Sequence, residues 1–213
     1  MLTAGCSDNN DPADTDAAGG ASATPTTESS PTAGATESAG GEADAVSFDT
    51  LTGEATRLTL DDGITSALST LGVELSATGG AQMESAGAAT TFTFPVTGGQ
   101  ATVDPAAPES FTGTVAHEGG LQLSAFGRTA TVDQLVLDGG QGQLTAMVAG
   151  RRVPLLPLAT DPQITQEGSE QVTVAYSAAP LDTSAVQQFA EQLGLPSLPS
   201  LEVNSLEATL EGS

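Results

Sequence analysis

Few side chains in this sequence of 213 residues have the chemistry of a catalytic or metal site. The chain contains one cysteine, one histidine and one tyrosine, and it has one pair of adjacent basic residues; these are Cys6, His117, Tyr176, Arg151 and Arg152. Histidine and tyrosine can bind iron, and an arginine pair can bind an anion. A single cysteine and a single histidine are too few to hold zinc. Because a Gly-x-Ser-x-Gly elbow and a phosphate-binding glycine loop are also missing, we predict that the protein is not an enzyme.

The residues around Cys6 indicate lipid attachment. Leu2-Thr3-Ala4-Gly5-Cys6 resembles the end of a bacterial lipoprotein signal peptide, in which the cysteine becomes the lipidated N-terminus after cleavage. The resemblance implies a diacylglyceryl anchor, whose two acyl chains hold a protein on a membrane more firmly than one. The leucine lies one residue further from the cysteine than is usual. We expect residues 1–6 to be the remnant of this signal and the protein to lie on the outer face of the cytoplasmic membrane, in the cell envelope.

Residues 7–45 have the composition of a disordered tether. They are rich in Ala, Thr, Gly, Ser and Pro, and they carry acidic residues but no basic or aromatic residue. Such a segment cannot bury enough apolar surface to offset the entropy lost on ordering. The remaining residues, 46–213, are enough for one domain with its own core.

The charge of the chain excludes several partners. It has 27 acidic residues against four arginines and no lysine, which gives a formal net charge of −23. Nucleic-acid binding needs a basic surface, so we expect no nucleic-acid partner. The same charge disfavours contact between the protein surface and anionic lipid head groups. Abundant Ala, Gly and Thr without lysine are typical of a GC-rich genome, and we expect an actinobacterial host.

The hydrophobic pattern from Val46 onward predicts a mainly β fold. Alternating segments about ten residues apart, separated by Gly-rich turns, are typical of an antiparallel β-sandwich or a barrel-like sheet. The clearest expected strands are Ala55–Leu60, Thr90–Val96, Phe111–Ala116, Leu121–Phe126, Thr129–Val132, Leu135–Leu137, Leu144–Ala149, Gln171–Tyr176 and Leu201–Leu210. The segment Val153–Leu158 contains two prolines, so we place it at a sheet edge.

Two short helices interrupt this pattern. Ile64, Ala67, Leu68 and Leu71 recur at helical spacing after Asp61-Asp62-Gly63, which supplies capping chemistry. A second helix is expected over Ser184–Leu193, with Asp182 as its N-terminal cap and Gly194 as its C-terminal stop.

One block resembles a known family. The segment Gly113–Leu123 contains His117, Gly119 and Leu121 at the spacing of a signature found in the Hta-type haem-binding domains of actinobacterial surface proteins. Downstream, Leu144-Thr145-Ala146 is similar to the start of a later strand in that family. The resemblance covers roughly residues 55–210, and its specific part is the region 90–150.

The family resemblance implies a β-sandwich-like fold and a haem site. In haem-binding members, a tyrosine early in the domain binds the iron and a histidine at the position of His117 supports that tyrosine. This chain has no tyrosine before Tyr176, so the early ligand has no counterpart. We therefore expect no bound cofactor, and haem stays as a candidate.

Each candidate side chain also has a structural interpretation, which we favour. His117 is either a ligand or hydrogen-bond partner in a site near a β-turn, or a turn residue that hydrogen-bonds a backbone carbonyl. Tyr176 either binds iron or fills a sheet face with its hydroxyl at the edge. Arg151 and Arg152 either bind an anion or pair with nearby acids.

Three hypotheses about function follow. The first is a non-enzymatic, lipid-anchored envelope module that binds a partner protein or another envelope component. The second is a binder of haem or another small molecule. The third is a carrier whose sheets enclose a hydrophobic ligand, which an apolar cavity would favour.

Overall fold

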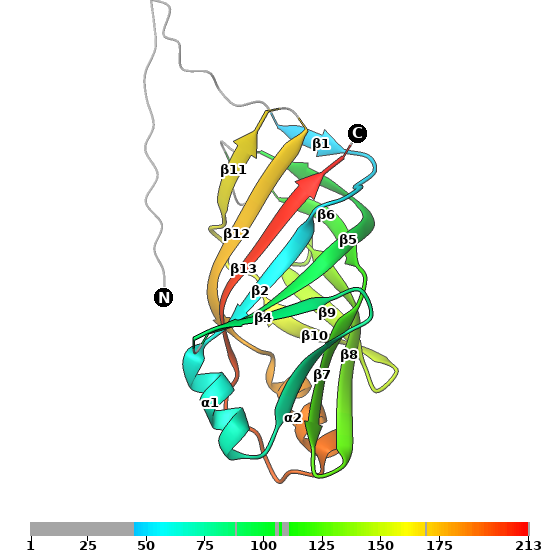
Figure 1. The fold of residues 1–213 in the computed structure, drawn as a ribbon. Coiled ribbons are helices and arrows are strands. Elements are labelled where there is room, and N and C mark those ends of the chain that lie inside the picture. Colours follow the sequence, from blue (N-terminus) through cyan, green and yellow to red (C-terminus); the bar gives the residue numbers. More distant parts are fainter. Residues whose placement is uncertain (1–44, 88, 105–106, 108–110, 169, 213) are drawn as a thin grey trace, which may run out of the picture. The chain divides into compact units, whose positions relative to one another are not determined.

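The computed structural model describes residues 45–87, 89–104, 107, 111–168 and 170–212 (Figure 1). The expected signal remnant with Cys6, and the expected tether apart from Ala45, lie outside these residues. These ranges therefore belong to the β-rich domain.

The domain is built from strands and two helices, as the sequence predicts. In chain order, the elements are β1 (Val46–Phe48), β2 (Ala55–Leu60), α1 (Asp62–Thr70), β3 (Glu74–Thr78), β4 (Gln82–Ala86), β5 (Ala89–Val103), β6 (Thr112–His117), β7 (Gly120–Ala125), β8 (Arg128–Asp138), β9 (Gln143–Val148), β10 (Arg151–Pro157), β11 (Gln163–Glu167), β12 (Gln171–Pro180), α2 (Thr183–Leu193) and β13 (Glu202–Glu211). All the strand pairs are antiparallel, which confirms the predicted fold class.

The longest strand, β5, organises the sheet. The main strand order is β10-β9-β8-β6-β5-β2-β13-β12-β11. Along one side, β5 pairs with β2 and then β1, and along the other side it pairs with β4 and then β6. A register shift between Val96 and Gly98 bends the strand at the point where its partners change. Gly99 lies against the carbonyl of Thr114, where a side chain would collide with the backbone of β6.

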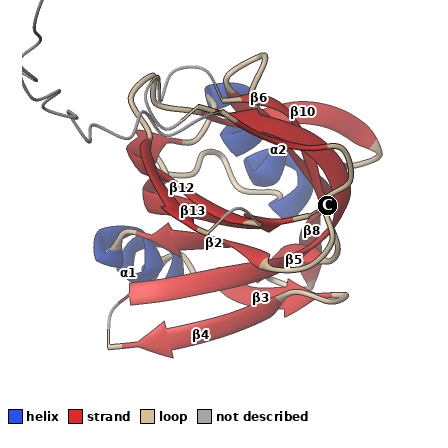
Figure 2. Cartoon of the chain, turned by 90° about the horizontal axis from the view of Figure 1, so that it is seen from above, coloured by secondary structure: helices blue, strands red, loops and turns tan. Residues whose placement is uncertain are grey.

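The sheet curls until its two ends approach each other. β10 stands at one end of the strand order and nevertheless contacts β12, which is next to the other end. Just after β12, the backbone N–H of Asp182 donates to the carbonyl of Leu155 in β10 at 2.7 Å. The view in Figure 2 shows the strands curving around an interior. The domain is therefore a curled, barrel-like sheet, and the expected edge position of Val153–Leu158 is confirmed by β10.

Both helices are capped as their sequences predict. Asp61 accepts a hydrogen bond from the backbone N–H of Gly63, and Asp182 accepts one from that of Ser184, each at 2.8 Å. Such caps satisfy N–H groups that have no partner inside the helix. α2 ends at Gly194, whose positive φ of 70° suits glycine. α1 packs against β5, and α2 packs against β7, β8 and β10.

The core fills the inside of the curled sheet. Alternate residues of the central strands are buried there, including Phe92 and Phe94 of β5 and Val172 and Val174 of β12. The two phenylalanine rings stack with their centroids 6.2 Å apart. The buried faces of the helices add Leu68 and Phe189, among others. Apolar burial of this kind is the main stabilising contribution to such a domain.

Candidate functional site

His117 is a buried residue at the end of β6, with 6% of its surface exposed. Its Nδ1 lies 3.2 Å from the carbonyl oxygen of Leu135 in β8, and its Nε2 lies 2.7 Å from the hydroxyl of Thr56 in β2. Since a carbonyl can only accept, Nδ1 carries the proton, and Nε2 accepts from Thr56. A bond to a backbone carbonyl is what the structural interpretation of His117 predicts, although His117 ends strand β6 and does not lie in the turn that follows.

The surroundings of His117 keep its ring neutral. Burial lowers the pKa of His117 to about 4, against a smaller upward effect of the hydrogen bond to Leu135. Both nitrogens of a neutral ring are already used in this arrangement. His117 therefore ties β2, β6 and β8 together, and it has no free nitrogen for a ligand.

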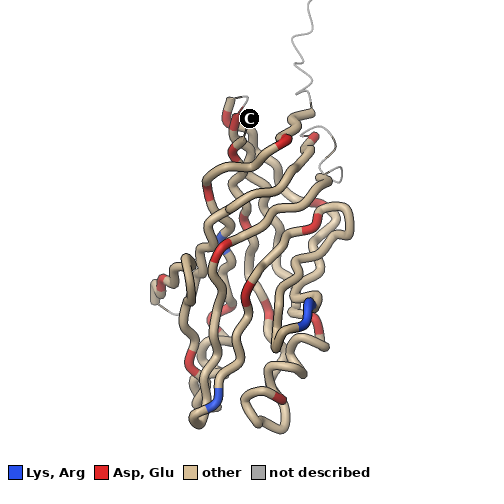
Figure 3. The backbone as a smooth tube through the Cα atoms, turned by 90° about the vertical axis from the view of Figure 1, so that its right-hand side faces the viewer, with Lys and Arg blue, Asp and Glu red and all other residues tan. Residues whose placement is uncertain are grey.

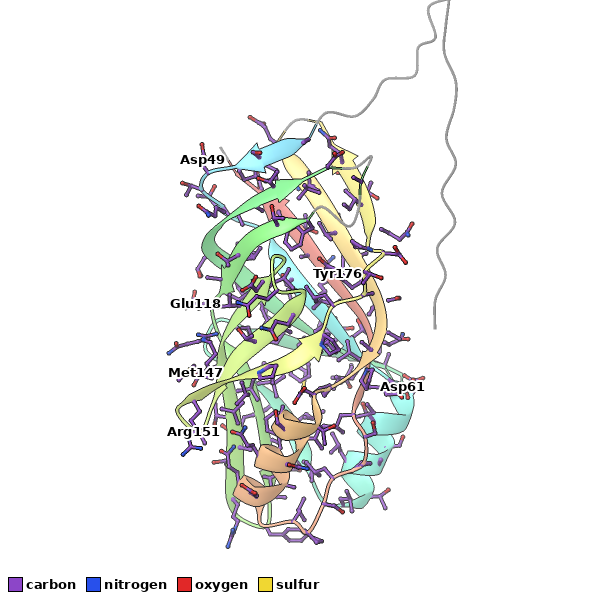
Figure 4. All side chains as sticks on the ribbon, turned by 180° about the vertical axis from the view of Figure 1, so that it is seen from behind. Asp49, Asp61, Glu118, Met147, Arg151 and Tyr176 are labelled. Carbon is purple, nitrogen blue, oxygen red and sulfur yellow. The ribbon has the colours of Figure 1, made fainter. Side chains whose placement is uncertain are left out.

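Tyr176 lies in β12 (labelled in Figure 4) with 4% of its surface exposed, on the same buried face as Val172 and Val174. Its side chain lines a cleft of about 310 Å³ between the β8–β9 loop, the β10–β11 loop and Phe111. The cleft has no charged side chain in its described lining. Burial raises the pKa of Tyr176, so its hydroxyl stays protonated at neutral pH.

Arg151 and Arg152 lie at the exposed start of β10. Within the part of the chain that the structure describes, neither forms the ion pair that we expect from the sequence; the ion pair found there joins Arg57 and Glu207 at 3.5 Å. Arg152 instead donates to the carbonyl of Gln134 at 3.2 Å and to the hydroxyl of Thr145 at 3.1 Å. Among the described residues, the acidic side chains are spread over the domain (Figure 3), and none forms an ion pair with Arg151 or Arg152.

The structure does not gather the candidate residues into one site. Tyr176 lines the cleft, whereas His117, Arg151 and Arg152 do not. Arg151 and Tyr176 are well separated in Figure 4. A haem site would need a free axial ligand and cations near its propionates. The described residues do not fit such a group, because the nitrogens of His117 are engaged and the cleft beside Tyr176 contains no arginine.

A second space in the domain is entirely apolar. It has a free volume of about 50 Å³ and lies between the helices and the inner face of the sheet. Its lining consists of sixteen aliphatic or aromatic side chains, among them Leu68 of α1, Leu123 of β7, Leu144 of β9 and Phe189 of α2. This volume exceeds the roughly 10–15 Å³ that one water needs, but it is about a third of the roughly 150 Å³ of an apolar cavity that holds benzene, so a larger molecule enters only if the lining side chains move apart. A cavity without polar groups stays dry and accepts apolar molecules.

Metal sites and membrane-spanning helices are both absent from the described residues. No group of three or more His, Cys, Asp or Glu side chains in the described ranges could hold a metal ion. Neither helix of the described domain is long and apolar enough to cross a membrane.

The fold and these spaces define the class of protein: a mainly β domain with a curled antiparallel sheet and an apolar interior. Within that class, the chain is similar in fold to the crystal structure of the C-terminal domain of HtaA from Corynebacterium glutamicum, with 16% identity and a TM-score of 0.45. The match covers 75% of this chain and 99% of the HtaA domain. No family model matches the sequence, and no curated protein does. This partial likeness assigns no role to any residue.

Two features of these sites were not predicted from the sequence. Thr56 is an ordinary alternating residue of an expected strand, and nothing local marks it as the partner of a histidine 61 positions away. The apolar cavity is formed by residues from both helices and several strands. Only the closed arrangement of those elements brings their leucines together.

Proposed function

We propose that this is an exported, lipid-anchored protein of the cell envelope whose non-enzymatic β domain binds a ligand with a hydrocarbon part. Cys6 carries the anchor, and residues 7–45 tether the domain to the membrane. The observation that carries the ligand class is the apolar cavity, whose described lining contains no polar side chain. A cavity of this kind was the feature expected to favour a hydrophobic carrier over a haem binder.

The charge of the protein narrows the ligand further. The cavity lining contains no cation that could neutralise an anionic group. The whole chain carries a formal charge of −23, which repels anions. A neutral ligand with an alkyl chain therefore suits this cavity better than a free fatty acid does.

The cavity wall lies close to exposed apolar side chains. Leu68 lines the cavity, and Leu71, one helical turn further along, is 37% exposed. A side-chain carbon placed on Gly72 would lie 3.5 Å from the ring of Phe126, which is 78% exposed at the tip of the β7–β8 hairpin. Leu71 and Phe126 are thus exposed apolar side chains near the segment that follows Leu68, and we propose that a hydrocarbon chain enters the cavity from this side.

Ligand binding can be tested with the full chain and N-phenyl-1-naphthylamine, a neutral dye whose fluorescence rises in apolar sites. We expect saturable binding that 1-decanol displaces. Leu144→Ala enlarges the cavity and should tighten dye binding, although it costs about 2–5 kcal/mol of stability. Val132→Leu fills part of the cavity and should weaken dye binding.

The matched control is Leu210→Ala. Leu210 is as buried as Leu144, at 0% and 1% exposure, but it does not line the cavity. This variant should lose similar stability and leave dye affinity unchanged. Equal effects of the two leucine variants on dye binding would instead show that the dye reports general loosening of the core, and the proposed ligand class would be wrong.

Anchoring has its own test. In an actinobacterial host that expresses the protein, Cys6→Ser should move the protein from the membrane fraction to the medium, and acylated Cys6 should be detected by mass spectrometry in the unaltered protein. Retention of the serine variant in the membrane fraction would contradict lipid anchoring.

A further inference from the structure

The cleft beside Tyr176 is separate from the apolar cavity, because no residue lines both. It lies between two loops that the protein holds firmly. The backbone N–H of Leu158 donates to the carbonyl of Gly142 at 2.8 Å, which joins the β10–β11 loop to the β8–β9 loop. Asp138 accepts from both the backbone and the side-chain nitrogen of Gln141, each at 2.9 Å. These hydrogen bonds connect the two loops that form the described walls of the cleft.

One wall of the cleft depends on a glycine. A side-chain carbon on Gly139 would lie 2.4 Å from the ring of Phe111, so this ring packs directly on the backbone of the β8–β9 loop. Phe111 is 4% exposed and lines the cleft together with Leu158 and the buried Pro162. These side chains give the cleft an apolar floor.

The hydroxyl of Tyr176 is the unexplained polar group of this cleft. Only 4% of the surface of Tyr176 is exposed, yet its hydroxyl has no hydrogen-bond partner among the described residues. Among the described residues, Thr65 Oγ1 is the side-chain polar atom that is both fully buried and without a hydrogen-bond partner. The unpaired hydroxyl of Tyr176 is therefore not fully buried. Its remaining access is through the cleft that Tyr176 lines. Because this hydroxyl is open to the cleft, water can pair with it there, and a bound molecule with an acceptor oxygen would take the place of that water.

The chemistry of the lining selects the partner. The described lining combines apolar side chains, glycine backbone and the neutral polar groups of Gln141, Thr160 and Tyr176, with no charged side chain. The amide of Gln141 is already bonded to Asp138 and Gln143. We propose that this cleft binds a small neutral molecule with an apolar ring or short chain, whose carbonyl oxygen accepts a hydrogen bond from Tyr176. A cleft of about 310 Å³ is at the lower end of the range of small-molecule sites.

The chain itself supplies the reporter for this site. Tyr176 is the only tyrosine and the sequence has no tryptophan, so tyrosine emission comes from the proposed site alone. The probe is acetanilide, a neutral ring with an amide carbonyl, added to the full-length protein. We expect a saturable change in Tyr176 emission. Benzoate, which is anionic, and ethylbenzene, which has no acceptor, should bind at least about tenfold more weakly.

Variants separate a specific site from adventitious binding. By ligand-detected NMR, Tyr176→Phe should weaken acetanilide binding by about tenfold, because it removes only the hydroxyl. Ala159→Leu fills the cleft and should abolish binding, whereas Ala178→Leu, at an exposed alanine of β12 outside the cleft, should not. Circular dichroism checks that each variant folds. Unchanged binding in both Tyr176→Phe and Ala159→Leu would overturn the proposal and mean an adventitious additive only. Competition of acetanilide with N-phenyl-1-naphthylamine would also overturn it, by placing both molecules in the apolar cavity.

Discussion

The Nε2 atom of His117 lies 2.7 Å from the hydroxyl of Thr56, across the long strand β5 that separates their own strands. The other ring nitrogen donates to Leu135, whose carbonyl is made available by the register shift of β8 between Asp133 and Val136. One histidine thus joins three strands on the inner face of the curled sheet. The histidine that the family resemblance associates with a ligand is here a structural residue with both nitrogens paired.

The first prediction concerns the partner of this histidine. Thr56→Val keeps the shape of the side chain and removes the hydroxyl, so that Nε2 of buried His117 loses its donor. We expect unfolding free energy to fall by about 1–3 kcal/mol, the cost of an unpaired buried polar group. Chemical denaturation measures this change. The matched control is Thr59→Val in the same strand. The hydroxyl of Thr59 pairs with that of part-buried Thr91, so its removal should lower the unfolding free energy by less. Equal costs for the two variants would contradict the special role of Thr56.

The second prediction concerns acid stability. The pKa of His117 is about 4 in the folded protein and close to 6.5 when the chain unfolds. Above pH 6.5 the ring is neutral in both states and its contribution is complete. As the pH falls from 6.5 to 4, the unfolded chain takes up the proton first, and up to about 3 kcal/mol of stability is lost.

A non-titrating variant isolates this effect from the many carboxylates. The unfolding free energy of the unaltered protein and of His117→Gln should be measured from pH 7 to pH 4. The difference between them should shrink by about 3 kcal/mol over this range, because the acidic residues are the same in both. A difference that stays constant with pH would show that His117 does not titrate as its burial requires.

The third prediction concerns haem. Haemin added to the full-length protein should give no saturable shift of its absorption band, because His117 has no free nitrogen and the Tyr176 cleft has no cation for the propionates. A saturable shift that is lost in His117→Ala or Tyr176→Phe would contradict this expectation. It would mean that haem binding rearranges the core around that residue.

Local signals in the sequence were enough to predict both helices and many of the strands. Asp61, Asp182 and Gly194 cap the helices where they were expected, because capping depends on neighbouring residues only. The prolines of Val153–Leu158 placed this segment at an edge for an equally local reason, since proline cannot donate a hydrogen bond.

Features that depend on tertiary pairing were not predicted. β4 is exposed along its whole length, so it lacks the alternation that marks a strand, and it forms because it pairs with β5. The segments Thr129–Val132 and Leu135–Leu137 were expected as two strands, but they belong to the single strand β8. The positive φ of Gln134, 49°, marks the irregularity that separates them in the pattern. Nor could the sequence indicate the cavity, the cleft or the Thr56–His117 hydrogen bond, which exist only when the sheet curls.

The fourth prediction concerns the exposed phenylalanine at the tip of the β7–β8 hairpin. Ala125 pairs with Arg128, and the two residues between them, Phe126 and Gly127, have positive φ values of 53° and 78°. This is the geometry of a type I′ turn, in which Asn is favoured at the first position and an aromatic residue is strained. Because Phe126 is 78% exposed, little packing is lost on its replacement. Phe126→Asn should therefore raise the unfolding free energy by about 1 kcal/mol.

The β9–β10 hairpin provides the matched control for this last prediction. Ala149 and Gly150 form an equivalent turn, with φ values of 51° and 75°. Ala149→Asn relieves the same backbone strain without removing an aromatic ring, so both variants should be stabilised by a similar amount. If only Ala149→Asn gains stability, packing of the Phe126 ring near Gly72 offsets the strain. If Phe126→Asn gains stability and at the same time slows uptake of N-phenyl-1-naphthylamine, Phe126 is kept at this tip for the entry of the ligand and not for the fold.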